Sequence, residues 1–152
     1  MTINRRLFLK ASIFTGALIT TLTSLKALAE WPKAAFEAKS VDDTLKILFG
    51  SAQLIESDQI KIKAPEIAEN GRTVPITLST TIENAESITV LAANNPSPLS
   101  ASFTFSPNVG AKISTKIKMA KTGDLIAVVK ADNKHYVARQ EVKITKGGCG
   151  GS

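Results

Sequence analysis

Residues 59–145 contain short segments in which apolar and polar residues alternate, separated by residues that favour turns. A period of two places the apolar side chains on one face of a β-strand, so each segment predicts a half-buried strand. Residues 125–129 are continuously apolar, which is typical of a central strand covered on both faces. The alternating apolar positions are Ile60 and Ile62; Val74, Ile76, Leu78 and Ile82; Ile88, Val90 and Ala92; Ala101, Phe103 and Phe105; and Ile113, Ile117 and Met119.

The last strand is expected over residues 134–145, after a hairpin turn at Asp132 and Asn133. Its predicted core face carries Tyr136, Ala138, Val142 and Ile144. About seven strands without intervening helices predict that residues 58–145 form an antiparallel β-sandwich of immunoglobulin-like type. An open sandwich has edge strands with unpaired backbone groups, so an edge is a candidate site for a partner protein.

Residues 30–57 carry helix signals and form the predicted N-terminal helical segment. Ser40 is a candidate N-cap, two carboxylates follow it in the first turn, and Gly50 can end the helix. We expect this segment to lie along one sheet or across an edge. The aromatic side chains of Trp31 and Phe36 are expected to pack on the body of the protein and not to line a ligand site.

Residues 1–29 have the pattern of an export signal. Arg5 and Arg6 are followed by a hydrophobic pair and a lysine, which resembles a twin-arginine signal peptide. The apolar run at 11–25 is shorter than the roughly 20 residues that span a bilayer, and residues 27–29 form a small-x-small cleavage site. We therefore expect cleavage, no stable membrane anchor, and twin-arginine export to a bacterial periplasm. An uncleaved membrane anchor is the alternative.

Most of the positive charge lies in this signal. Removing residues 1–29, which contain four basic and no acidic residues, lowers the formal net charge from +6 to +2. No later segment combines a basic cluster with interleaved aromatic residues, the combination that binds phosphates and stacks on bases. We therefore predict that the protein does not bind nucleic acid.

Cys149 is the only cysteine in the sequence, which excludes an intramolecular disulfide and a cysteine-only metal site. Its flanking residues are Gly147, Gly148, Gly150 and Gly151. Glycine widens the accessible backbone angles and adds no side chain that could pack, so residues 146–152 predict a flexible arm that presents the thiol to other proteins. The alternatives are a frayed terminus and an intermolecular disulfide between two copies.

Catalysis by Cys149 itself is not expected. A thiol nucleophile needs a positioned base, and the only histidine, His135, is expected to be a surface residue of the last strand, with nothing to place it beside the arm. The spacing of His, Cys and carboxylate residues does not predict a zinc site. We expect no cofactor other than a sulfur species held covalently by Cys149.

Several segments resemble the SoxY family, the sulfur carriers of periplasmic thiosulfate oxidation. They are residues 62–71 with Val74 and Pro75, residues 95–99, residues 113–119, and the terminal stretch 147–151. Ser152 departs from the family, whose members usually end on the second glycine of the pair.

The resemblance implies a non-catalytic carrier in which Cys149 holds sulfur intermediates, first as a cysteine S-thiosulfonate. It implies a heterodimer with SoxZ and transient contacts with three enzymes: the c-type cytochrome SoxXA, the hydrolase SoxB and, where present, the sulfane dehydrogenase SoxCD. The residues alone leave two other functions open. One is an immunoglobulin-like structural module cross-linked through its cysteine, and the other is an adaptor that passes disulfides to client proteins.

Overall fold

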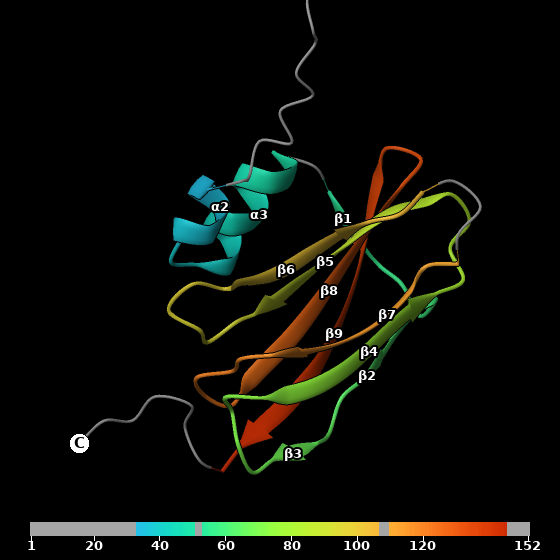
Figure 1. Ribbon diagram of the computed structural model, residues 1–152. Helices are drawn as coiled ribbons and strands as arrows, with labels where there is room; N and C mark the ends of the chain where they lie inside the picture. Colours follow the sequence, from blue (N-terminus) through green and yellow to red (C-terminus); the bar gives the residue numbers. More distant parts are fainter. Residues whose placement is uncertain (1–32, 51–52, 107–109, 146–152) are drawn as a thin grey trace, which may run out of the picture. The chain divides into compact units, whose positions relative to one another are not determined.

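The computed structural model describes residues 33–50, 53–106 and 110–145 (Figure 1). Residues 1–29, Trp31 and the predicted arm at 146–152 lie outside the described residues. No helix in the described part of the chain is long and apolar enough to cross a bilayer. The elements are α2 (Lys33–Glu37), α3 (Val41–Phe49), β1 (Leu54–Glu56), β2 (Ile60–Lys63), β3 (Ile67–Ala68), β4 (Val74–Thr80), β5 (Ala85–Ala92), β6 (Leu99–Thr104), β7 (Lys112–Ile117), β8 (Gly123–Ala131) and β9 (Lys134–Ile144).

The strands form two sheets, as predicted for a sandwich. The larger sheet has the order β1-β9-β8-β5-β6, with β3 also paired to β9, and the smaller sheet has the order β2-β4-β7. Five of the strand pairs are antiparallel: β2 with β4, β4 with β7, β5 with β6, β5 with β8, and β8 with β9. The mainly β fold with a short helical segment is therefore confirmed.

Two parallel pairings differ from the predicted antiparallel pattern. β1 runs parallel to the first part of β9, with Leu54 opposite His135, and β3 runs parallel to its end, with Ile67 opposite Lys143. β1 also lies inside residues 30–57, where the sequence favours helix. Both strands are too short to show an alternation of apolar and polar residues. Their extended conformation is therefore determined by pairing with β9 and not by the local sequence pattern.

The larger sheet is covered on both faces, and β8 shows this most clearly. Leu125, Ala127 and Val129 face the core between the two sheets, whereas Ile126 and Val128 belong to a second apolar cluster. That second cluster is packed against Val41, Leu45 and Phe49 of α3. The prediction of a central strand covered on both faces is confirmed.

Helix α3 begins and ends where the sequence predicts. Ser40 Oγ accepts a hydrogen bond from the Asp43 N–H at 3.0 Å, which satisfies an orphan donor of the first turn. Gly50 has φ 66° and ψ −137°, and its N–H donates to the Lys46 carbonyl at 2.8 Å. This backbone conformation is largely restricted to glycine, so Gly50 lets the chain turn away from the helix.

A two-residue hairpin fixes the register of β8 and β9. Asp132 and Asn133 have φ angles of 47° and 59°, as a type I′ turn requires. The resulting register directs Tyr136, Ala138, Val142 and Ile144 to the core between the sheets, as predicted. It also directs His135 and Val137 to the opposite face, where both are buried and Val137 belongs to the second apolar cluster.

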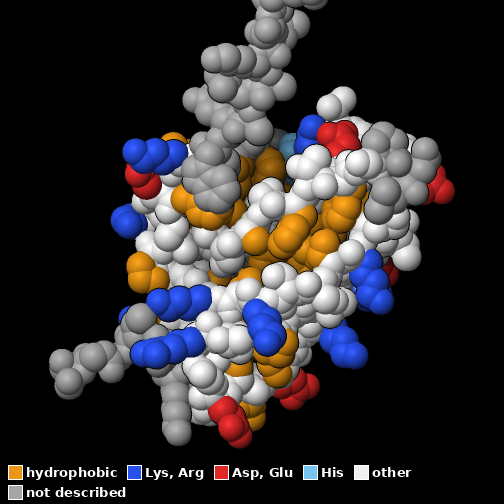
Figure 2. Space-filling view, viewed as in Figure 1, with side chains coloured by type: hydrophobic (Ala, Val, Ile, Leu, Met, Phe, Trp, Pro, Cys, Tyr) orange, Lys and Arg blue, Asp and Glu red, His pale blue; other side chains and the backbone are white. Residues whose placement is uncertain are grey.

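The two sheets do not close on each other along β6 and β7, which are the outer strands of their sheets. Figure 2 shows an apolar strip between these strands, and the partly buried residues there include Ala101, Phe103, Phe105 and Ile113. Phe36 of α2 is half-buried at one end of this opening, in a depression that Leu99 and Ile117 also line. The predicted open edges are therefore present in the described sandwich.

Candidate functional site

The predicted sulfur-attachment site lies beyond the last described residue, Thr145. The predicted site residues that fall outside the described ranges are Cys149, Gly147, Gly148, Gly150 and Gly151, together with Arg5 and Arg6 of the signal. What the structure describes is the root of the arm, where β9 ends. We call the residues that hold this end of β9, namely Glu66, Ala68 and Thr122, the arm root.

The arm root holds the end of β9 on two sides. On one side, the Lys143 N–H donates to the Glu66 carbonyl at 2.9 Å and the Thr145 N–H donates to the Ala68 carbonyl at 3.1 Å. On the other side, the Ile144 N–H donates to Thr122 Oγ1 at 2.8 Å. The chain is therefore fixed through Thr145 before the glycine-rich sequence begins.

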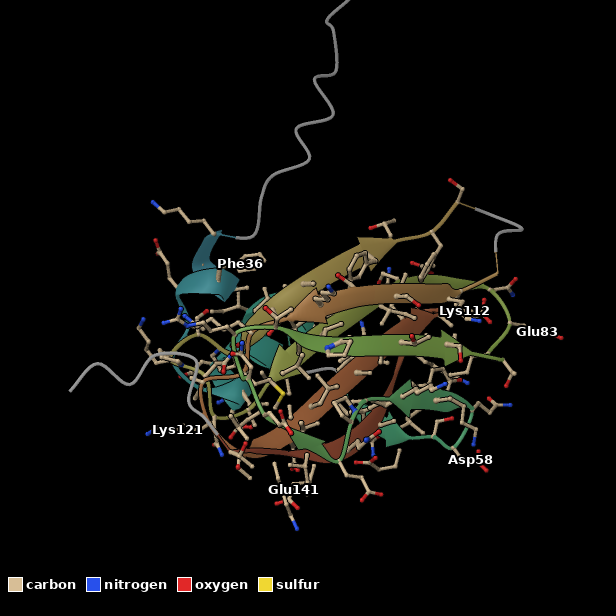
Figure 3. The ribbon with its side chains drawn as sticks, turned by 60° about the horizontal axis from the view of Figure 1, so that its bottom comes forward. Phe36, Asp58, Glu83, Lys112, Lys121 and Glu141 are labelled. Carbon is tan, nitrogen blue, oxygen red and sulfur yellow. The ribbon has the colours of Figure 1, made fainter. Side chains whose placement is uncertain are left out.

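The distance that Cys149 can reach is set by chain length. Four residues at about 3.5 Å each keep its Cα within about 14 Å of the Thr145 Cα. Exposed side chains of both signs surround this end of the sandwich, among them Lys121 and Glu141, which point outward in Figure 3. Because the charges are mixed, the arm root itself is not a strongly charged surface.

His135 cannot act as a base for Cys149 of the same chain. It lies at the start of β9, ten residues before Thr145, which is about 30 Å away at the rise of an extended strand. That separation exceeds the reach of the arm. The described root therefore gives the thiol no access to the histidine of its own chain.

The prediction that His135 is a surface residue is wrong. Its exposed fraction is 8%, and its ring centroid lies 4.5 Å from that of Phe49 in α3. Nδ1 is buried and has no hydrogen-bond partner among the described residues. The alternation of β9 correctly places His135 away from the core between the sheets, but α3 covers that face.

Burial lowers the pKa of His135 below its ordinary value of 6.5, and nearby Lys130 lowers it further, against a smaller opposing effect of Glu86. The unfolded chain then binds more protons than the folded chain between the two pKa values. The contribution of His135 to the free energy of unfolding is therefore complete above about pH 6.5 and decreases as the pH falls towards the lowered pKa.

We expect His135→Leu to weaken this pH dependence. Leucine fills a similar space, does not titrate and removes the buried Nδ1. Urea denaturation of both proteins at several pH values between about 5 and 7.5 measures the effect, because His is the side chain that ordinarily titrates in this range. The free energy of unfolding should decrease less on acidification in the variant than in the parent. Equal decreases in the two proteins would contradict this assignment.

In the described part of the chain, no group of three or more His, Cys, Asp or Glu side chains is arranged to hold a metal ion. The structure does bring together a set of lysines that the sequence analysis missed. Lys61, Lys63, Lys112 and Lys116 are exposed residues of the smaller sheet. They come from two strands far apart in sequence, and their only sequence signal is the alternation of lysine with apolar residues.

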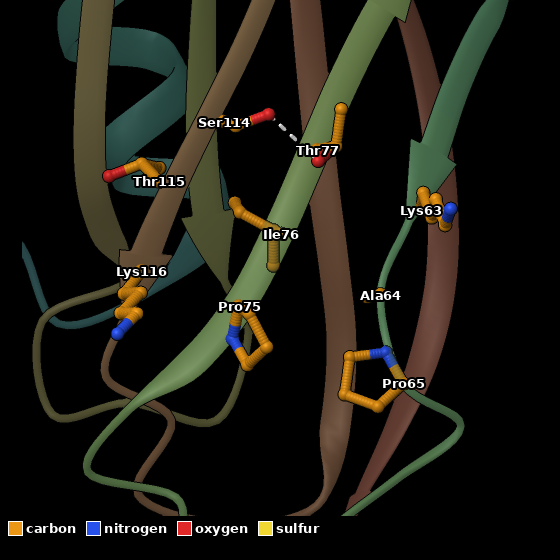
Figure 4. Close-up of a pocket in the computed structure, with 9 residues that line it drawn as sticks. All are labelled: Lys63, Ala64, Pro65, Pro75, Ile76, Thr77, Ser114, Thr115 and Lys116. Carbon is orange, nitrogen blue, oxygen red and sulfur yellow. Dashed lines mark hydrogen bonds between the residues drawn. The ribbon is translucent and has the colours of Figure 1, made fainter.

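An open depression of about 530 Å³ lies on this sheet (Figure 4). Lys63, Ala64 and Pro65 line one side, and Ser114 and Lys116 line the other. Thr77 and Ser114 are joined across it by a hydrogen bond of 2.9 Å between their hydroxyl oxygens. Pro75, Ile76 and Thr77 of β4 also line the depression, so its surface combines apolar side chains with small hydroxyl groups.

Comparison with known proteins identifies the family. The family model for the sulfur oxidation protein SoxY matches residues 45–149. The structure of the sulfur carrier protein SoxY from Chlorobium limicola f thiosulfatophilum shares 45% sequence identity and a TM-score of 0.65, and the match covers 70% of this chain and 97% of that one.

A PKD domain of an M14-like peptidase from Thermoplasmatales archaeon SCGC AB-540-F20 shares 19% identity over 61% of this chain and 95% of that one, with a TM-score of only 0.39. No match was found among curated proteins. The family model and the Chlorobium structure agree with each other. The chain belongs to the SoxY family of sulfur oxidation proteins.

Proposed function

We propose that this chain is the sulfur-carrier subunit of a periplasmic thiosulfate-oxidising system, with the thiol of Cys149 as the point of attachment. The observation that carries the proposal is the extent of the family match, which runs from residue 45 to residue 149 and so ends on the only cysteine of the chain. The structure of the Chlorobium relative is named as that of a sulfur carrier protein.

Loading is an oxidation of the thiol. The Cys149 thiolate and thiosulfate form a new S–S bond, giving Cys–S–S–SO₃⁻, and two electrons pass to a c-type cytochrome partner, SoxXA. Hydrolysis by SoxB then cleaves the bond to the sulfone: water supplies the fourth oxygen of sulfate, two protons are released, and Cys–S–S⁻ remains. Where SoxCD is present, it oxidises the remaining sulfur for a further hydrolysis.

The chain contributes no catalytic group to these steps. His135 is beyond the reach of the arm, so the described residues offer no histidine base, and the partner enzymes must supply the chemistry. A thiol between four glycines suits this function because thin flanks let the same atom enter several enzymes. Heterodimerisation with SoxZ, for which the open edges are candidate sites, and twin-arginine export to the periplasm complete the proposal.

Mass spectrometry of the Cys149 peptide tests the proposal. After incubation of the mature chain, in complex with SoxZ, with thiosulfate and oxidised SoxXA, the peptide should gain the mass of one S₂O₃ unit. Later addition of SoxB should convert this adduct to one that retains a single extra sulfur. Omission of SoxXA is the control, because the coupling requires an oxidant. An unmodified Cys149 peptide in the complete mixture would refute the proposal.

A further inference from the structure

The outer face of the smaller sheet carries four lysines and no carboxylate. We call Lys61, Lys63, Lys112 and Lys116 the lysine face. β2, β4 and β7 contain no acidic residue and no aromatic residue. The lysines therefore stand on a sheet surface whose other outward residues are small or polar: Pro75, Thr77, Ser79 and Ser114.

The strand register arranges these lysines on both sides of a polar central strand. Ser79 of β4 lies opposite Lys61 on one side and Lys112 on the other. Thr77 lies opposite Lys63 and Ser114, and Pro75 lies opposite Lys116. At the usual spacing of strands, the two rows of lysines are about 10 Å apart, and the depression of Figure 4 lies between Lys63 and Lys116.

These charges are not neutralised within the described chain. The ion pairs among described residues join Lys33 to Glu37, Lys130 to Glu86 and Arg139 to Glu56, so none involves the lysine face. The chain without residues 1–29 has a formal net charge of +2, so the four lysines of this face leave the rest of that chain with a formal net charge of −2.

The lysine face is also close to the arm root along the chain. Lys63 ends β2, and Glu66, three residues later, accepts the hydrogen bond from Lys143 near the end of β9. A protein seated on the lysine face would therefore lie beside the point from which the arm leaves. The arm can extend about 14 Å from Thr145 to the Cys149 Cα, so such a protein could receive the thiol.

We propose that the lysine face is the docking surface for an acidic patch on the enzymes that load and unload Cys149. This inference rests on the proposed function. Clustered like charges on one face steer an oppositely charged protein and raise its association rate by about 10- to 1,000-fold. Steering suits a carrier, which must bind several enzymes in turn and leave each of them.

The chemistry of the face favours a protein over other anionic partners. It has no aromatic side chain on which a nucleotide base could stack or which could anchor in a lipid headgroup layer. A single small oxyanion would engage only part of a face whose lysines stand about 10 Å apart across β4. An acidic protein surface can meet all four lysines at once.

The test compares two charge-matched variants in the complex with SoxZ. The face variant carries Lys61→Gln, Lys63→Gln, Lys112→Gln and Lys116→Gln. The control variant carries Lys33→Gln, Lys39→Gln, Lys46→Gln and Lys134→Gln, which removes the same charge from exposed positions outside β2, β4 and β7. Urea denaturation and alkylation of Cys149 by iodoacetamide establish that both variants are folded and present a reactive thiol.

The measured quantity is kcat/KM of SoxXA for the carrier, by thiosulfate-dependent haem reduction. At low salt it should fall about 10-fold or more in the face variant and less than about twofold in the control. The fall should come from KM, and about 0.5 M salt should remove it, since the Debye length is then only a few ångströms. Equal values for the two variants would overturn the inference.

Two further measurements distinguish a protein partner from a membrane and from a small anion. Binding of the parent, but not the face variant, to vesicles of phosphatidylglycerol, with equal kcat/KM in the two variants, would assign the face to a membrane and overturn the proposal. If free sulfate at low millimolar concentration abolishes the difference in kcat/KM between the variants at constant ionic strength, the face is a small-anion site and the proposal is also overturned.

Failure of the proposed function and failure of the docking surface give different results. If the parent itself is never loaded at Cys149, the proposed function fails. If both variants are loaded as well as the parent, only the docking surface is refuted.

Discussion

Replacing Cys149 with serine is expected to reduce thiosulfate-dependent electron transfer to the rate measured without any carrier. A serine hydroxyl has neither the thiolate character nor the sulfur needed to form an S–S bond with thiosulfate. No other residue can substitute, because the sequence has a single cysteine. Reduction of SoxXA by thiosulfate, followed at the haem absorption, measures the loss.

Ser152→Ala is the matched control for this experiment. It changes one side chain in the same terminal stretch, three residues beyond the thiol, and leaves Cys149 in place. Its turnover should equal that of the parent, since it leaves the thiol and the four flanking glycines unchanged. The urea midpoint of Cys149→Ser should match the parent, because position 149 lies outside β9, which ends at Ile144, and carries a small side chain in both proteins. Retention of full turnover by Cys149→Ser would contradict the carrier function.

The sandwich could be predicted because its strands are long enough to show a period. β4 alternates buried and more exposed positions along its length, and the apolar run of β8 is buried on both faces. Helix α3 was predictable from local chemistry as well, because Ser40 and Gly50 act within one turn of its ends. Each of these signals lies within the segment that it specifies.

What could not be predicted depends on contacts between distant segments. β1 and β3 are three and two residues long and exist through parallel pairing with β9. The alternation of β9 shows that His135 and Tyr136 face opposite ways, but not that Phe49 of α3 covers His135. The order of strands in a sheet is likewise absent from a local pattern.

The candidate site, too, was predictable only where its signal lies within one segment of the sequence. The attachment residue was predicted from its own neighbourhood, a cysteine between glycines, and stays a prediction because Cys149 lies outside the described residues. The lysine face needs the order β2-β4-β7, which brings Lys61 and Lys112 to either side of Ser79. In the sequence, these two lysines are separated by β3 through β6 and form no visible cluster.

The second large effect expected is on stability. Leu78→Ala should lower the free energy of unfolding by about 2–5 kcal/mol, the usual cost of truncating a leucine in a well-packed core. Leu78 is 0% exposed and lies on β4, the central strand of the smaller sheet, where its side chain faces the core between the sheets. Urea denaturation measures the change as a shift of the midpoint at constant m-value.

Ile67→Ala is the control, because Ile67 is a large aliphatic residue of the same domain that is 59% exposed. Its truncation should change the free energy of unfolding by only about 0.5 kcal/mol, as is usual for surface positions. If Leu78→Ala does not fold, the milder Ile76→Val, on the same buried face of β4, should still cost about 0.5–1.5 kcal/mol. Equal losses at Leu78 and Ile67 would mean that β4 does not face the core. The lysine face would then lose its basis too, because the outward direction of Thr77 and Ser79 follows from the inward direction of Leu78.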